Sequence, residues 1–161
     1  FPKNANETIL CNILGKSNIA LLFGMDKHAH QLLGESFPHA RIFACISPLT
    51  EHFTQKSRED NHRKLYAHFK QNQMDIIAFD KGKLLLINTF HCKHTSDTIY
   101  YLLHVWQQLG FNQENDQLWL AGKIEAKEDL LTELNKFLRK VTLIPMQEPL
   151  PFDIQTLMTC E

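Results

Sequence analysis

Histidine, cysteine and carboxylate side chains bind metals in proteins, and one short stretch of this sequence concentrates them. The stretch His91-Cys92-Lys93-His94 holds three potential zinc ligands within four residues. A zinc site needs four ligands, which commonly come from two separated pairs. Because this stretch stands alone, it is interpreted as a solvent-exposed loop without a metal.

Two aspartates on one apolar run are the other candidates for metal chemistry. Asp75 and Asp80 lie five residues apart, so in a strand their side chains point to opposite faces of the sheet. Two-metal hydrolysis of nucleic acids requires several carboxylates around both ions, which argues against a nuclease. The sequence also lacks the Gly-x-Ser-x-Gly, Walker A and Gly-x-Gly-x-x-Gly motifs, which carry nucleophilic and nucleotide chemistry.

Charge and cysteine content narrow the class of protein. The formal net charge is −1 and the pI is about 6.8, which gives no basic footprint for nucleic acid. No apolar run reaches the length of about 18–20 residues that a membrane helix requires. The four cysteines are widely spaced, and Cys11 and Cys45 lie in apolar runs where a free thiol packs as a small hydrophobe. We expect a cytoplasmic protein without disulfide bonds.

Any such chemistry would be positioned by the second half of the chain, whose pattern of apolar residues is the clearer one. Three strands with tight turns are followed by a helix, a strand, a second helix and a last strand, an order of βββαβαβ. This order is that of the ribonuclease H-like fold, and Gly110 followed by Phe111 is typical of a helix C-terminus. The expected ranges are strands 64–70, 74–80 and 83–90, a helix from 95 to 109, strand 117–121, helix 127–140 and strand 141–144.

The first half predicts a β-β-α-β-α order and a separate domain. Strands are expected at 7–14, 19–25 and 40–47, with a first helix capped by Asp26 and a second capped by Ser47 before Pro48. Residues 55–61 are polar and lack an apolar period, so the boundary is placed there. The predicted domains are therefore residues 1–60 and 61–146, followed by a loosely packed C-terminal tail at 147–161.

The core of the second half resembles a known family. The stretches that carry the resemblance are Leu65-Tyr66, the run from Met74 through Asp80-Lys81-Gly82 to Phe90, Tyr100-Tyr101-Leu102-Leu103 and Gln108-Leu109-Gly110. Together they are similar to the bacterial domain-of-unknown-function family 3822, over roughly residues 7–146. More distantly, the chain resembles the cytoplasmic actin-like proteins of type IV pilus and type II secretion systems.

The resemblance implies an actin-like fold of two subdomains. Residues 1–60 would then be the remainder of a first subdomain whose opening strands are absent from this sequence. Actin-like ATPases hold ATP and Mg²⁺ on glycine-containing turns, because glycine lets backbone amides approach the phosphates. The corresponding turn here, Gln71-Asn72-Gln73, has neither aspartate nor glycine, and the turn Leu120-Ala121-Gly122-Lys123 has a single glycine.

The residues implied as nucleotide-binding candidates are therefore Asn72, Gly122 and Lys123. Because the turns lack the expected residues, we expect a non-catalytic scaffold or interaction module that binds a protein partner or itself. The alternative is an actin-like protein that binds ATP with Mg²⁺ and whose first phosphate loop lies outside this chain.

Overall fold

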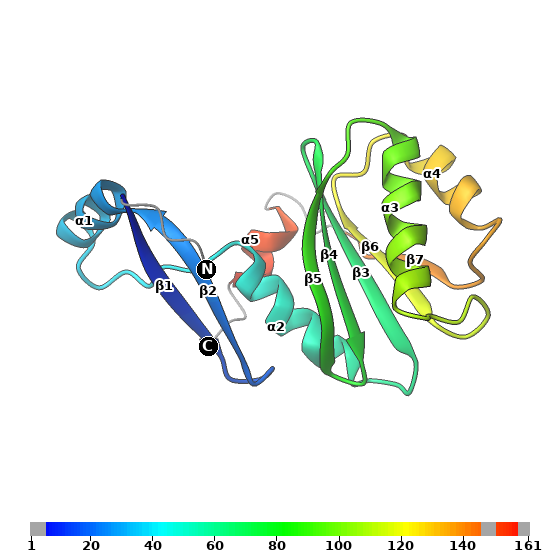
Figure 1. Ribbon diagram of the computed structural model, residues 1–161, viewed down its shortest axis with the longest axis horizontal. Coiled ribbons are helices and arrows are strands. Elements are labelled where there is room, and N and C mark those ends of the chain that lie inside the picture. The colour runs from blue at the N-terminus through cyan, green and yellow to red at the C-terminus, as the bar shows by residue number, and fades with distance from the viewer. Residues whose placement is uncertain (1–5, 146–150, 158–161) are drawn as a thin grey trace.

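The computed structural model describes residues 6–145 and 151–157 of the chain. A five-stranded sheet with helices on both faces forms the larger part (Figure 1). A two-stranded ribbon with a short helix at its end projects to one side, and helix α2 lies between the ribbon and the sheet.

The five-stranded sheet confirms the expected βββαβαβ order. Its strands lie side by side as β5-β4-β3-β6-β7, with β3, β4 and β5 antiparallel and β6 and β7 parallel to β3. β3 and β4 are buried on both faces along their length, as expected for the centre of a sheet covered by helices. The strands are β3 Arg63–Lys70, β4 Gln73–Asp80, β5 Lys83–His91, β6 Gln117–Gly122 and β7 Val141–Leu143.

Helices α3 (Thr95–Gln108) and α4 (Lys127–Leu134) cover one face of the sheet. The end of α3 forms the expected Schellman motif, because Gly110 has a φ of +64° and the Phe111 amide donates to the carbonyl of Trp106 at 3.0 Å. At the other end of α3 the N-cap is His94. α4 stops at Leu134, so the expected helix 127–140 is too long, and Phe137 is 48% exposed.

Helices α2 (Ile46–Ser57) and α5 (Phe152–Leu157) cover the other face. Phe53 of α2 stacks on Tyr66 of β3 with ring centroids 4.1 Å apart. Phe152 of α5 is 7% exposed and lies 5.8 Å from the Phe53 ring. The prediction of a loose tail is therefore wrong for residues 152–157, while 146–150 and 158–161 lie outside the described residues.

The ribbon pairs β1 (Glu7–Leu14) with β2 (Ile19–Asp26), and α1 (Lys27–Ser36) follows it. Asp26 caps α1 as expected, since its carboxylate accepts from the amides of His28 and Ala29. None of the α1 side chains is buried. The apolar side chains of Ala29, Leu32 and Leu33 on this helix therefore contact no core.

The strand expected at Ala40–Ser47 does not form, and residues 40–44 are extended loop. Asn12 takes the place of a neighbouring strand: its amide donates to Ile42 O at 2.8 Å, and its carbonyl oxygen accepts from Ala44 N and Ser47 Oγ at 2.9 and 2.8 Å. Ser47 therefore does not cap α2, which begins at Ile46 after the N-cap residue Cys45, two residues earlier than expected. Side-chain hydrogen bonds here replace those of a β-ladder.

Cys11 and Cys45 are both exposed, so their interpretation as buried small hydrophobes is wrong. Cys11 lies on β1 of the ribbon, and Cys45 directly precedes α2. No helix in the described part of the chain is both long enough and apolar enough to span a membrane.

Candidate functional site

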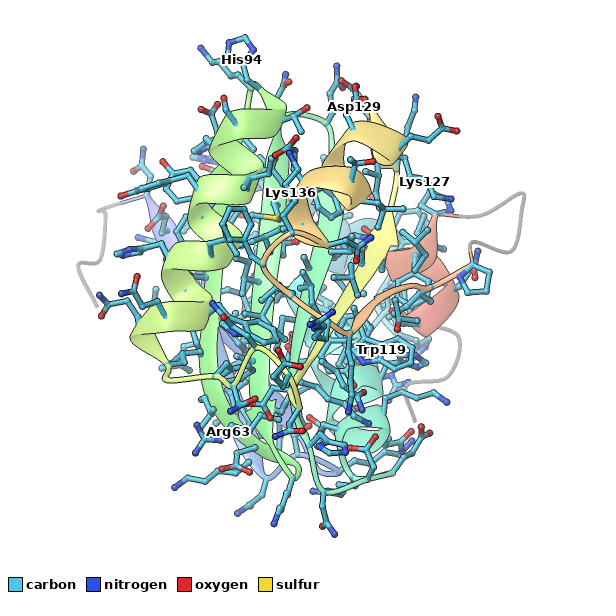
Figure 2. All side chains as sticks on the ribbon, turned by 90° about the vertical axis from the view of Figure 1, so that its right-hand side faces the viewer. Arg63, His94, Trp119, Lys127, Asp129 and Lys136 are labelled. Atoms are coloured by element: carbon cyan, nitrogen blue, oxygen red, sulfur yellow. The ribbon has the colours of Figure 1, made fainter. Side chains whose placement is uncertain are left out.

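A cavity of about 220 Å³ opens at the end of the sheet where β3 and β6 finish and where α3 and α4 begin. Figure 2 shows this end at the top, with His94 at the start of α3 and Lys127 and Asp129 at the start of α4. Three connections meet here: the turn between β3 and β4, the loop from β5 to α3 and the loop from β6 to α4. The lining residues are Phe69, Lys70, Asn72, Gln73, Cys92, Lys93, His94, Thr95, Thr98, Lys123, Glu125, Ala126 and Leu130.

Asn72 reaches the cavity from the two-residue turn between β3 and β4. Its φ is +55°, in the left-handed region that asparagine tolerates better than most residues. The carbonyl oxygen of Asn72 accepts from the amide of Cys92 at 3.1 Å. This bond ties the β3–β4 turn to the loop that leads into α3.

Lys123 lines the same cavity, whereas Gly122 does not. Gly122 has a φ of +88°, and a Cβ built there would lie 2.3 Å from the carbonyl oxygen of Phe69. Only glycine therefore lets the end of β6 lie this close to β3. Gly122 lines a separate cavity of about 300 Å³ beside β7. The structure thus places Asn72 and Lys123 on the same cavity and Gly122 on a different one.

The charges on the cavity are mostly positive. Lys70 Nζ pairs with Asp75 Oδ2 at 2.9 Å, whereas the ammonium groups of Lys93 and Lys123 have no carboxylate within 4 Å among the described residues. Glu125 is the one carboxylate on the lining. Two unpaired lysines at the mouth of a small cavity could accept an anionic group.

The first turn of α3 adds little to anion binding. The carboxylate of Asp97 accepts from the amides of Lys93 and His94, both at 3.1 Å. These two amides precede the helix, and the Asp97 carboxylate places a negative charge in its first turn, which disfavours an anion. Because the helix start is closed by its own capping box, the positive charge of the cavity comes from lysine side chains.

A buried polar cluster that sequence reasoning missed lies on the opposite face of β3 and β4. His68 Nδ1 is 3.7 Å from Asp75 Oδ2, and Thr89 Oγ1 donates to Asp75 Oδ1 at 2.6 Å. Burial alone would raise the pKa of Asp75, but the neighbouring His68, Thr89 and Lys70 outweigh it and lower the pKa to about 2. The two-residue turn fixes this pairing, since it sets His68 opposite Asp75. The position of this turn can be read from the sequence, and it predicts that His68 and Asp75 pair across the two strands.

The earlier metal candidates remain apart in the structure. Within residues 6–145 and 151–157, no three histidine, cysteine or carboxylate side chains gather closely enough to hold a metal ion. His91, Lys93 and His94 are exposed as expected, although His91 is the last residue of β5 and only the residues after it form a loop. Asp75 belongs to the buried cluster, while Asp80 pairs with Arg63 at 3.4 Å.

Comparison with known proteins gives a family match and a fold. Residues 1–141 match the family model described as "Protein of unknown function (DUF3822)". A crystal structure from Bacteroides thetaiotaomicron VPI-5482, described as a protein with actin-like ATPase fold and unknown function, is 45% identical with a TM-score of 0.89. The match covers 100% of this chain and 62% of that one. No curated protein matches the chain.

Proposed function

This chain belongs to the DUF3822 family and has the actin-like ATPase fold, and from that premise we propose that it is a non-catalytic scaffold or interaction module. Its partner is another protein or a second copy of the chain. The ribbon formed by β1 and β2 supports this proposal most directly. This ribbon and α1, with the residue that follows it, form the proposed interaction surface.

The ribbon and α1 expose large apolar side chains. Ile13 is 74% exposed and Leu22 53%, on neighbouring strands, while Leu32 on α1 is 64% and Phe37 after it is 61%. A two-stranded ribbon by itself is marginally stable in water, and apolar clusters on a surface mark sites of protein contact. Additional β structure or a partner on this surface would remove these side chains from water.

The turns at the cavity support the non-catalytic part of the proposal. The carbonyl of Asn72 is bound by Cys92, and the amide of Lys123 donates to Phe69 O at 3.3 Å. Phosphate-binding turns direct amide N–H groups at the anion, and the Lys123 amide is here used within the protein. The turn 71–73 also has no glycine to let a phosphate approach.

The proposal is tested by replacing the exposed apolar pair of the ribbon. The double variant Ile13→Ser, Leu22→Ser should lose self-association in multi-angle light scattering, and it should lose any partner that the wild type recovers stoichiometrically. The matched control is Tyr100→Ser, since Tyr100 is 61% exposed on α3, away from the ribbon. A wild type that stays monomeric at high concentration and recovers no partner would rule the scaffold out.

A second candidate function is binding of ATP with Mg²⁺. The observation that favours it is the joint placement of Asn72 and Lys123 on a cavity with the unpaired ammonium of Lys93. ATP at a hundred times its Kd should stabilise the protein by about 2.7 kcal/mol. A thermal shift with millimolar ATP and Mg²⁺ measures this, and an unchanged midpoint would dismiss nucleotide binding.

We also propose that the protein works in the cytoplasm. The thiols of Cys11 and Cys45 are exposed and free. Exposed thiols persist where glutathione and thioredoxin keep them reduced. Labelling of both cysteines by maleimide in intact cells, without prior reduction, would support this placement, and disulfide formation in the native protein would contradict it.

A further inference from the structure

A second cavity, of about 230 Å³, lies on the other face of the sheet, where the C-terminal half of α2 crosses β3 and β6. Its walls are His52, Lys56, Glu59, Lys64, Tyr66 and Trp119, together with two residues that follow β7. It shares no lining residue with the cavity of Asn72 and Lys123. Figure 2 shows Trp119 in the lower half of the view, far from His94 at the top. The cavity is therefore separate from the candidate nucleotide site.

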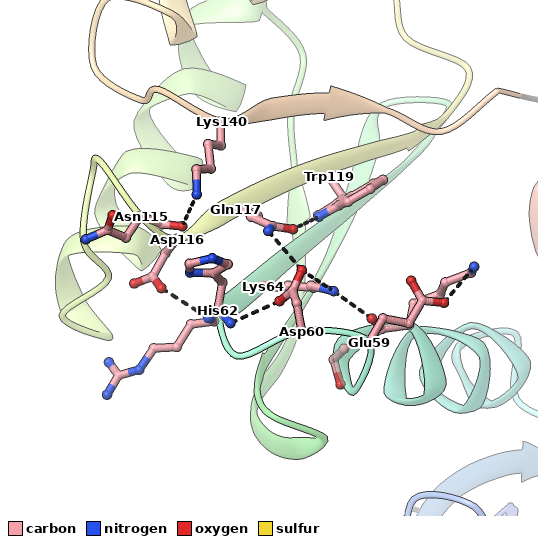
Figure 3. Close-up of polar contacts among 12 residues, drawn as sticks. Glu59, Asp60, His62, Lys64, Asn115, Asp116, Gln117, Trp119 and Lys140 are labelled. Atoms are coloured by element: carbon pink, nitrogen blue, oxygen red, sulfur yellow. Dashed lines mark hydrogen bonds and ion pairs between the residues drawn. The ribbon is translucent and has the colours of Figure 1, made fainter.

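Flat aromatic surfaces shape this cavity. Tyr66 stacks on Phe53 at 4.1 Å and lies tilted by 30° to Trp119, with ring centroids 6.4 Å apart. Trp119 Nε1 donates to Gln117 Oε1 at 3.0 Å, and Gln117 Nε2 donates in turn to Asp60 Oδ2 at 3.1 Å (Figure 3). The indole is therefore held in place without a ligand, which lowers the entropic cost of stacking on it.

The hydroxyl of Tyr66 has no hydrogen-bond partner in the described part of the protein. The Tyr66 side chain is 1% exposed, and its hydroxyl makes no hydrogen bond to any residue in the described ranges. Buried tyrosine hydroxyls usually have a hydrogen-bond partner. Because Tyr66 lines the cavity, a molecule in that space can supply the missing partner.

The charged groups around the cavity neutralise one another. Lys56 Nζ pairs with Glu59 Oε1 at 2.9 Å. Lys64, which is 2% exposed, pairs with Asp60 at 3.2 Å and also donates to Lys56 O at 2.7 Å. Each ammonium thus has its own carboxylate, so an anionic ligand would have to compete with Glu59 or Asp60. An uncharged ligand meets no such cost.

His52 completes the polar lining as a neutral imidazole. Burial, and then the charge of Lys56, lower the pKa of His52 below its usual value of 6.5. A neutral imidazole offers one donor and one acceptor. Together with the Tyr66 hydroxyl, the cavity presents two groups that can each donate or accept beside the Trp119 ring.

We propose that this cavity binds an uncharged, planar heteroaromatic molecule the size of a fused bicyclic ring. The ligand stacks against Trp119 and exchanges hydrogen bonds with the hydroxyl of Tyr66 and the imidazole of His52. Small-molecule sites combine apolar walls with a few placed polar groups in this way. This site is independent of the interaction surface on the ribbon, and a failure of either proposal leaves the other intact.

The test uses benzimidazole and adenine as uncharged probes and benzoate as a charged planar control, at mildly alkaline pH. The chain has two tryptophans, and Trp106 is 3% exposed in the core beneath α3. The variant Trp106→Phe therefore leaves Trp119 as the single fluorescent reporter. The uncharged probes should change its fluorescence saturably, and benzoate should bind about tenfold more weakly because its charge has no free partner.

Two substitutions test the contacts. Tyr66→Phe should weaken probe binding roughly three- to tenfold, the effect of one hydrogen bond, without lowering the melting temperature, because the lost hydroxyl has no partner in the protein. Trp119→Leu should weaken binding by about tenfold or more through lost stacking. Tyr101→Phe on the opposite face of the sheet, where Tyr101 stacks on Phe90, is the matched control and should bind as wild type.

Ligand-observed saturation-transfer NMR on the unmodified chain gives the same answer if Trp106→Phe does not fold. Saturable binding of the uncharged probes that Tyr66→Phe weakens supports the proposal. Absence of binding at millimolar concentration overturns it. Equal binding by Tyr66→Phe and wild type, or a preference for benzoate, overturns it as well.

Discussion

Replacing Asp75 with asparagine should destabilise the protein by about 2–3 kcal/mol at neutral pH. The pKa of the Asp75 carboxyl falls from 3.8 to about 2 in the folded state, and one pKa unit corresponds to about 1.36 kcal/mol. Asp75 is 4% exposed, so solvent screens its interactions little. Lys70, whose side chain is 30% exposed, can turn to water in the variant, so no positive charge is left buried.

The sign of the pH dependence follows from the direction of the shift. Because the folded-state pKa lies below that of the unfolded chain, the stabilisation is fully present above about pH 4 and is lost as the pH falls toward about 2. Urea denaturation of wild type and Asp75→Asn at a series of pH values measures the difference directly. The two free energies of unfolding should converge at the acidic end.

The matched control is Asp80→Asn on the same strand. The Asp80 side chain is 35% exposed and lies 3.4 Å from Arg63 Nε, and exposed ion pairs contribute at most about 1 kcal/mol. A destabilisation of Asp75→Asn that stays constant with pH would refute the reasoning, because the charge of Asp75 would then not be its cause. Equal effects of the two substitutions would refute it too.

Three further substitutions, one of them with a matched control, probe the contacts that shape the site and its supports. Gly122→Ala should cost about 3 kcal/mol or more in urea denaturation, because φ is +88° and the added Cβ would lie 2.3 Å from a carbonyl oxygen of β3. The matched control is Gly34→Ala on α1, where nothing lies within 4 Å of the added Cβ. This variant should stabilise the protein by about 0.5–1 kcal/mol. Asn12→Ala removes three hydrogen bonds and should cost about 2–3 kcal/mol, with faster amide exchange at Ala44. Unchanged exchange there would show that Asn12 does not hold this segment. Phe152→Ala should cost about 3 kcal/mol and make α5 sensitive to limited proteolysis, whereas unchanged cleavage would show that this contact does not hold the helix.

The core of the fold could be predicted from local pattern because its elements carry continuous apolar surface. The runs 74–80 and 83–90 are apolar on both faces, and the helix that contains Leu102 and Trp106 repeats every three to four residues. Gly110 also ended that helix as expected. Such patterns involve residues that are close together in the sequence, so the strands and helices can be predicted from them without the tertiary structure.

The first half of the chain was harder because its elements contact little. The segment 40–47 alternates like a strand, but the side chain of Asn12, about thirty residues away, satisfies its backbone instead. The apolar residues around Cys11 and Cys45 predicted burial, yet both thiols are exposed. The ribbon that carries Cys11 has no sheet beside it in the described structure, and Cys45 lies in the turn before α2. Hydrophobic pattern predicts which face could be buried, not whether anything covers it.

For the candidate sites, the sequence by itself determined which residue types were available, and the tertiary structure decided which of them meet. Asn72 and Lys123 share a cavity because β3 and β6 are parallel neighbours that end at the same edge, whereas Gly122 lines the cavity beside β7. The aromatic cavity of Tyr66, His52 and Trp119 joins α2 and β3 with β6, which is distant from both in the chain. Such a convergence depends on how α2 packs across the sheet, which no spacing within a single element encodes.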